Sequence, residues 1–137
     1  MIVAGIGCRS GATADALAEA VTAALERCGL DRAQIDALAT DTTKGNEAGI
    51  IALASALALP LIFVAASEMQ KAANGAITFS ERVIALKGVP SVAETAAFAV
   101  AGRAARLLAP RVSTATATCA IAQGEGPVGE GPSGERS

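Results

Sequence analysis

The residues best suited to binding a ligand are three cations, each in or beside a turn that leads into a helix. Arg9 lies inside the glycine turn GIGCRSGAT, Lys44 lies in DTTKGNE, and Lys87 directly precedes GVPSVAE. The N-terminus of a helix offers unpaired N–H groups and the positive end of the helix dipole, so each turn favours an anion. On a chain with a net charge of −2, this pattern predicts a ligand that carries several negative groups.

The guanidinium of Arg9 provides a bidentate fork suited to a carboxylate or phosphate. Polar side chains and backbone amides of the same three turns would complete the site. The predicted ligand-binding residues are Gly7, Cys8, Arg9, Ser10, Thr13, Asp41, Lys44, Gly45, Glu47, Lys87, Gly88, Ser91 and Glu94.

Glu47 and Cys8 are the candidates for a catalytic group. The chain has no His and no Tyr, so proton transfer would depend on carboxylates, lysines and the Cys8 thiol. A carboxylate in the first turn of a helix explains Glu47 equally well. The capping-box spacing from Ser91 accounts for Glu94, and Ser10 has no visible base partner for a hydrolase triad.

Metal and nucleotide binding have little support. Cys8, Cys28 and Cys119 are widely spaced and no His is present, so we expect no metal, and we interpret Cys28 and Cys119 as buried reduced thiols. The glycine spacing departs from the dinucleotide fingerprint by one position, since Ser10 stands where the third glycine belongs. A nicotinamide or flavin site remains a minor alternative, with Asp41 as the ribose-binding acid, and we expect no cofactor.

The composition also excludes other classes of partner. Without a basic run, Trp or Tyr, the chain has little with which to neutralise phosphates or stack on bases, which argues against nucleic acid. No apolar run approaches the length of a membrane span and the N-terminus lacks signal-peptide character, so we expect a cytoplasmic protein without membrane contact.

The elements that must position these residues alternate between strand and helix. Expected strands are Ile2–Ala4, Ile35–Thr40, a central Leu61–Val64, and Val112–Ala122 as one bent strand or a hairpin. Expected helices are Thr13–Cys28, one that carries Ile50–Leu57 and is capped by Asp41 or a threonine, Ser67–Ala73, and one from Ser91 that Pro110 stops. Asn74-Gly75 predicts a turn, followed by a loop to Lys87 with one helical turn near Ser80.

This alternation predicts a single three-layer α/β domain over residues 1–122, with a mostly parallel sheet of about four to five strands flanked by helices. Ligands of such sheets bind beyond the carboxyl ends of the strands, where the three turns would converge. Residues 123–137 are rich in Gly, Pro, Glu and Ser and predict a disordered tail.

Three segments together resemble the CobE family, which matches the C-terminal domain of CbiG in cobalamin (vitamin B12) biosynthesis. They are Gly5-Ile6-Gly7-Cys8-Arg9 with Gly11 and Thr13, Lys44-x-x-Glu47-x-Gly49, and Gly88-Val89-Pro90-Ser91-Val92-Ala93-Glu94. The resemblance covers Ile2 to Ala122. It implies an α/β domain of corrin-ring synthesis that binds a precorrin or hydrogenobyrinic-acid-type tetrapyrrole as an accessory or carrier protein, and that meets other enzymes of the pathway.

The same resemblance implies an enzymatic alternative. CbiG of the anaerobic route is a cobalt-precorrin-5A hydrolase that opens a lactone, and it does so as a longer protein with further N-terminal domains. This chain resembles only the C-terminal part, and Gly45-Asn46 departs from the more charged pair expected after the lysine. Corrinoid precursors carry many acetate and propionate groups, which suits three cationic helix starts.

Overall fold

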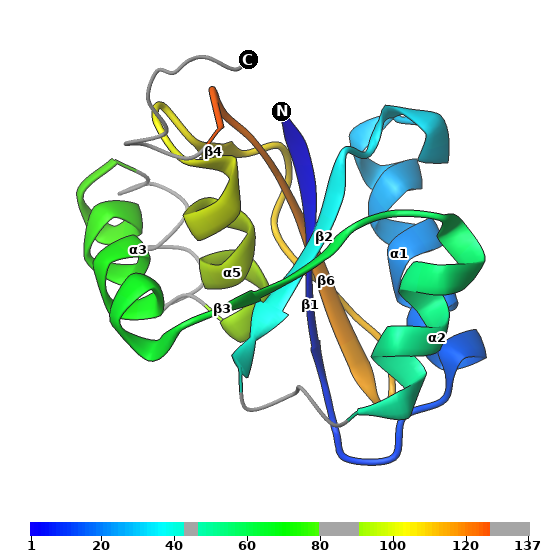
Figure 1. The fold of residues 1–137 in the computed structure, drawn as a ribbon. Helices are drawn as coiled ribbons and strands as arrows, with labels where there is room; N and C mark the ends of the chain where they lie inside the picture. The colour runs from blue at the N-terminus through cyan, green and yellow to red at the C-terminus, as the bar shows by residue number, and fades with distance from the viewer. Residues whose placement is uncertain (43–46, 80–90, 127–137) are drawn as a thin grey trace.

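The described part of the protein forms three layers, with a sheet between helices α1 and α2 on one face and α3 and α5 on the other (Figure 1). The computed structural model describes residues 1–42, 47–79 and 91–126, and of residues 73–79 only the helical backbone. Helices α1 (Ala14–Cys28) and α2 (Ala48–Leu57) cover one face. Helix α5 (Val92–Ala101) packs on the other face, with α3 (Ala66–Phe79) beside it. The predicted three-layer α/β class is confirmed.

The sheet is mixed rather than mostly parallel. Its order is β3-β2-β1-β6-β4, with the short β5 also paired to β6. The strands β1, β2 and β3 run parallel, whereas β6 is antiparallel to β1, β4 and β5. Their bounds are β1 Ile2–Cys8, β2 Ala37–Asp41, β3 Leu61–Val64, β4 Arg106–Leu107, β5 Val112–Ser113 and β6 Ala117–Gln123. The prediction of a parallel sheet holds for β1, β2 and β3, where α1 joins β1 to β2 and α2 joins β2 to β3.

The central position belongs to β1, and the prediction of a central Leu61–Val64 strand was wrong. β3 forms the edge of the sheet, and Phe63 on it is 39 % exposed. The chain winds outward from β1 through β2 to β3, then returns to the other side of β1 as β6. An apolar composition indicates that the faces of a strand are buried, but it does not determine the position of that strand in the sheet.

Local signals placed α1 and α5 correctly at their starts. The Thr13 hydroxyl accepts a hydrogen bond from the Ala16 N–H at 3.1 Å, and Gly29 closes α1 in the left-handed conformation. Ser91 and Glu94 form the predicted capping box. Helix α2 differs from the prediction: neither Asp41 nor Thr42 caps it, because β2 extends through Asp41 and the N-cap residue is Glu47.

Two predicted helix ends were wrong. The helix α3 continues through Asn74-Gly75 to Phe79, where a turn was expected; it packs against α5, and such tertiary contacts outweigh a local turn signal. The helix α5 ends at Ala101 rather than near Pro110, because Gly102 adopts a positive φ and the chain turns into β4. Arg103 and Arg106 therefore do not lie in this helix.

A close backbone approach fixes α5 against the centre of the sheet. A Cβ atom added to Gly5 on β1 would overlap the Ala93 carbonyl oxygen, so only glycine permits this packing. Buried alanines of α5, Ala96 and Ala97 among them, pack on Val3 and Ala39 of the sheet. Small residues thus bring the start of α5 next to the end of β1.

The chain after α5 forms a hairpin and then the last long strand. Val112–Ser113 pairs with Thr118–Cys119, which confirms the hairpin alternative for residues 112–122. Order continues into the segment predicted as a tail: Gln123 ends β6, and the Gly124 N–H donates to the Met1 carbonyl at 2.9 Å. Residues 127–137 lie outside the described part of the chain.

Candidate functional site

A cavity of about 430 Å³ opens where β1 ends, α5 begins and β5 turns into β6. Three short segments line it: Gly7, Cys8 and Arg9; Ser91, Val92 and Ala93; and residues 113–118. The register Cys8↔Ala117 places the end of β1 beside the start of β6, at the same end of the sheet (Figure 1). The first and third predicted turns therefore meet in one site.

The turn after β1 presents its cation to solvent but uses much of its own backbone. Arg9 is exposed, and its side chain forms no ion pair or hydrogen bond with any described residue. Its N–H donates to the Thr116 carbonyl at 2.9 Å, and the Gly11 N–H donates to Glu47 Oε1 at 3.0 Å. The amides expected to await an anion are thus partly occupied by the protein itself.

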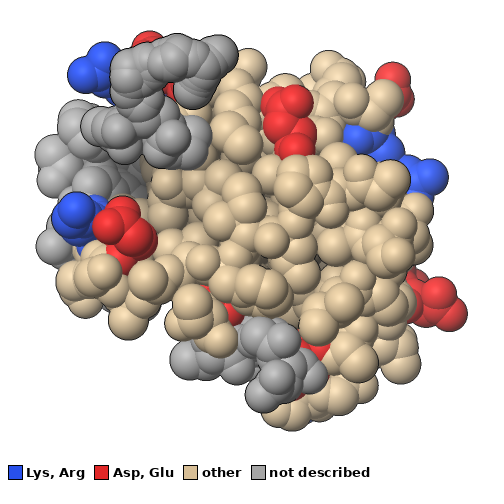
Figure 2. Space-filling model, viewed as in Figure 1, with Lys and Arg blue, Asp and Glu red and all other residues tan. Residues whose placement is uncertain are grey.

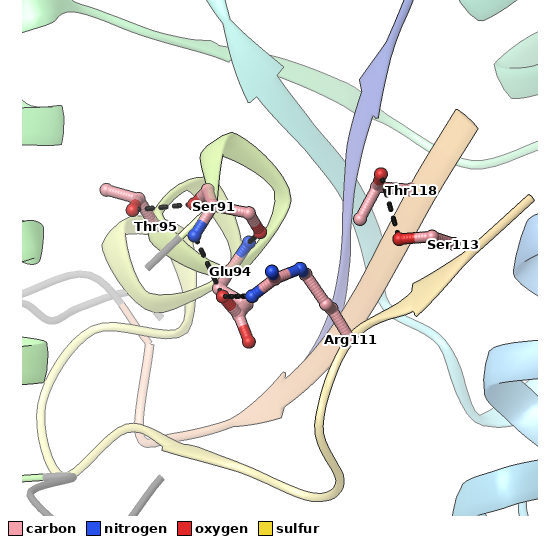
Figure 3. Close-up of polar contacts among 6 residues, drawn as sticks. All are labelled: Ser91, Glu94, Thr95, Arg111, Ser113 and Thr118. Carbon is pink, nitrogen blue, oxygen red and sulfur yellow. Dashed lines mark hydrogen bonds and ion pairs between the residues drawn. The ribbon is translucent and has the colours of Figure 1, made fainter. Parts of the chain in front are cut away.

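The start of α5 is held by a buried carboxylate. Glu94 is 1 % exposed, and its Oε1 accepts from the Ser91 N–H at 2.8 Å and from Arg111 Nη1 at 3.2 Å. Arg111 precedes β5 and reaches across to α5, as Figure 3 shows. Glu94 Oε2 is buried without a hydrogen-bond partner among the described residues. This ion pair ties together two walls of the cavity.

The hairpin wall was not predicted as part of the site. It contributes the hydroxyls of Ser113, Thr114, Thr116 and Thr118, while Ser113 and Thr118 share one hydrogen bond at 3.5 Å (Figure 3). Thr114 closes the turn through bonds to Ala117. The signal in the sequence is the alternation of Thr with Ala over residues 113–118, but only the pairing of β6 with β1 brings it to the site.

The predicted residues thus fall into four groups. Gly7, Cys8, Arg9 and Ser91 line the cavity. Glu47 Oε1 accepts a hydrogen bond from the Gly11 N–H of the first turn, and the buried Glu94 accepts one from the Ser91 N–H. Ser10 and Thr13 belong to the turn without lining the cavity, and Asp41 ends β2. Lys44, Gly45, Lys87 and Gly88 lie outside the described residues.

The three cysteines differ in burial. Cys119 is fully buried in β6, and this burial raises the pKa of its thiol to about 12. Partial burial raises the pKa of the Cys28 thiol, against the opposing effect of the nearby Arg27 charge. None of the three forms a disulfide bond with a described residue, and within the described ranges no group of three acidic or Cys side chains is arranged to hold a metal ion. Cys8 is the thiol that lines the cavity.

The charged side chains on the face shown in Figure 2 are scattered, with both signs present and no continuous basic patch. The described helices are also not long and apolar enough to cross a bilayer. Among the described residues that line the cavity, the charged side chain is that of Arg9.

The fold is that of a family of cobalamin synthesis proteins. Residues 2–122 match the family model described as Cobalamin synthesis G C-terminus, so the chain belongs to this family. It is 31 % identical over 121 residues to Protein CobE from Sinorhizobium sp, covering 88 % of this chain and 79 % of that protein.

Solved structures agree with this assignment. The crystal structure of cobalamin biosynthesis protein ChiG from Agrobacterium tumefaciens matches with a TM-score of 0.79 at 43 % identity, covering 91 % of this chain and 99 % of that one. The crystal structure of CobE, a protein from the cobalamin biosynthetic pathway, matches with a TM-score of 0.76 at 31 % identity, covering 92 % of both chains.

Proposed function

We propose that this protein binds a polycarboxylate precursor of the corrin ring, of precorrin or hydrogenobyrinic-acid type, and acts as an accessory or carrier protein in cobalamin synthesis. Membership of the family supports the pathway. The observation that carries the proposal is Arg9, which is exposed at a hydroxyl-lined cavity and has no partner among the described residues, because a guanidinium and O–H donors are groups that bind carboxylates.

The proposed ligand suits the charge of the site. Glu47 accepts a hydrogen bond from the Gly11 N–H, and Glu94 is paired with Arg111. A ligand carboxylate at Arg9 therefore meets a cation that forms no ion pair with any side chain in the described ranges. Because Arg9 is exposed, its attraction is screened by salt, and binding should weaken as ionic strength rises.

The test is to mix the purified protein with a pool of coloured tetrapyrrole intermediates and measure the pigment that co-elutes on gel filtration. Arg9→Ala should reduce the affinity about ten- to hundredfold, the loss expected for one charge-assisted contact. Arg32→Ala is the matched control, since Arg32 is an exposed arginine beside a different, smaller cavity between η1 (Arg32–Gln34) and α2. Absence of pigment from the wild-type peak would refute the proposal.

The lactone hydrolase alternative is tested in the same mixture by mass analysis of the recovered tetrapyrroles. Cys8 lines the cavity and is its candidate catalytic group, whereas Glu47 holds the Gly11 amide. Unchanged masses are expected for a carrier. Loss of the lactone with release of a two-carbon fragment, abolished in Cys8→Ala, would replace the carrier role with an enzymatic one.

A further inference from the structure

We infer that the cavity takes a single carboxylate-bearing pyrrole edge of a tetrapyrrole and leaves the rest of the ring system outside. This inference rests on the proposed function and specifies which part of the ligand the protein recognises. It is drawn from three properties of the described lining: the size of the cavity, the charge of Arg9, and the exposed apolar side chain of Val92.

The size of the cavity sets the first limit. Pockets for drug-sized ligands enclose about 300–1,000 Å³ and bury most of the ligand. The cavity of about 430 Å³ lies near the lower end of that range, while a tetrapyrrole with its acid arms is much larger than a drug-sized molecule. One ring with its substituents fits this space, and a whole macrocycle does not.

The charge of the lining sets the second limit. Arg9 is the charged residue among those that line the cavity, and the described lining contains no carboxylate. The lining also carries five hydroxyls, of which that of Thr114 already donates its proton to the Ala117 carbonyl at 3.3 Å. Because Ser113 and Thr118 share one hydrogen bond, a second O–H donor of that pair remains for a ligand. Such a lining can bind one or two acid groups, whereas the whole tetrapyrrole carries many more.

An apolar contact completes the match to a pyrrole. Val92 lies at the start of α5, lines the cavity and is 40 % exposed. Gly7 also lines the cavity and lies next to Val92, since a Cβ atom added to Gly7 would be 3.7 Å from Val92 Cβ. A flat ring can therefore rest against Val92 while its acid arms reach Arg9 and the hairpin hydroxyls.

The probes are uroporphyrin I, whose four pyrroles each carry one acetate and one propionate, and porphobilinogen, a single aminomethyl pyrrole with the same two arms. Uroporphyrin binding is followed by fluorescence, and porphobilinogen is added as competitor. We expect full displacement by porphobilinogen with one site per chain. The alkylpyrrole 3-ethyl-2,4-dimethylpyrrole, which lacks acid groups, should displace nothing.

A charge placed at the apolar wall tests the same site independently. Val92→Glu should weaken both uroporphyrin and porphobilinogen about tenfold or more, because the new carboxylate repels the acid arms. Ile51→Glu is the matched control: Ile51 is 48 % exposed on α2, away from the cavity, and its replacement should change neither affinity. Circular dichroism and thermal unfolding confirm that both variants remain folded.

The outcomes separate the two proposals. If uroporphyrin binds but saturating porphobilinogen does not displace it, or if Val92→Glu weakens uroporphyrin alone, the inference of a single-ring site is wrong while the carrier function stands. If neither uroporphyrin nor the natural pigment pool binds, the proposed function fails and this inference fails with it.

Discussion

The turn after β1 and the start of α5 meet at one cavity, yet each holds its arginine in a different way. Arg9 in the turn is exposed and unpaired among the described residues, whereas Arg111 beside α5 is bound to the buried Glu94 at 3.2 Å (Figure 3). The first arginine can contribute to ligand binding at little cost to folding. The second stabilises the fold and, through Glu94 and Ser91, the shape of the site.

The positions of both arginines depend on the packing of α5 against β1. Disrupting this packing should therefore have the largest effect on stability. Gly5→Ala places a Cβ atom against the Ala93 backbone and should lower the free energy of unfolding by about 3 kcal/mol or more. Gly7→Ala is the control, because its Cβ meets Ala93 N at an ordinary 3.6 Å. Urea unfolding measures both, and equal stability of the two variants would show that α5 does not pack as closely as described.

Breaking the buried ion pair between Arg111 and Glu94 should cause the second-largest loss of stability. Arg111→Ala leaves the buried Glu94 charge without its cation and should cost about 2–3 kcal/mol; this lies below the value for a fully buried pair because Arg111 is 27 % exposed. Glu94→Ala should cost a similar amount through the lost capping box. In the double variant the losses should fall short of additive by about 1 kcal/mol or more. Strict additivity would mean that the pair does not couple the two walls.

The control for this pair is the surface ion pair between Glu68 and Lys71 on α3. Both of these side chains are more than half exposed, and such pairs contribute about 0–1 kcal/mol. Glu68→Ala should therefore leave the urea midpoint nearly unchanged. A loss as large as that of Glu94→Ala would remove the distinction between buried and surface pairs on which the comparison rests.

Glu47 should have a smaller effect on stability. Glu47→Ala removes the acceptor of the Gly11 N–H, and we expect a loss of about 1 kcal/mol, typical of one hydrogen bond. Glu47→Gln keeps an acceptor oxygen at that position and should retain most of the stability. If the Gln variant is as unstable as the Ala variant, the carboxylate charge rather than the hydrogen bond holds the turn.

The smallest effect on stability, and the largest on binding, is expected for Arg9→Ala. Arg9 is exposed and has no partner in the part of the chain that the structure describes, so its loss should change the free energy of unfolding by less than about 0.5 kcal/mol. Unfolding and pigment retention are measured on the same preparation. A stability loss comparable to that of Arg111→Ala would place Arg9 in the fold rather than in the binding site.

The features that the sequence predicted best are those set by neighbours along the chain. Thr13 and Gly29 bound α1, and Ser91 with Glu94 starts α5, because caps depend on residues three or four positions apart. The edge position of β3 and the antiparallel β6 were not predicted, since strand order depends on packing of the whole chain. The continuation of α3 past Asn74 likewise follows from its contact with α5.

In the site, too, only the features set by neighbouring residues were predicted. The glycine turn and the capping box were found from local patterns, and the structure brings them to one cavity. The pairing of Arg111 with Glu94 spans 17 residues, and that of Glu47 with Gly11 spans 36. Nothing in the local pattern around Arg111 indicates a buried partner. The hydroxyls of residues 113–118 join the site only because β6 returns beside β1.

The most direct test of the account is to titrate the ¹⁵N-labelled protein with uroporphyrin I and map the amide shifts by NMR. The account predicts that the largest changes occur at Gly7–Arg9, at Ser91–Ala93 and along residues 113–118, the three segments that line the cavity. Amides around the smaller cavity at Arg32 and Leu57 should stay unchanged. Saturable shifts confined to that second cavity, or to the β3 edge, would contradict the account.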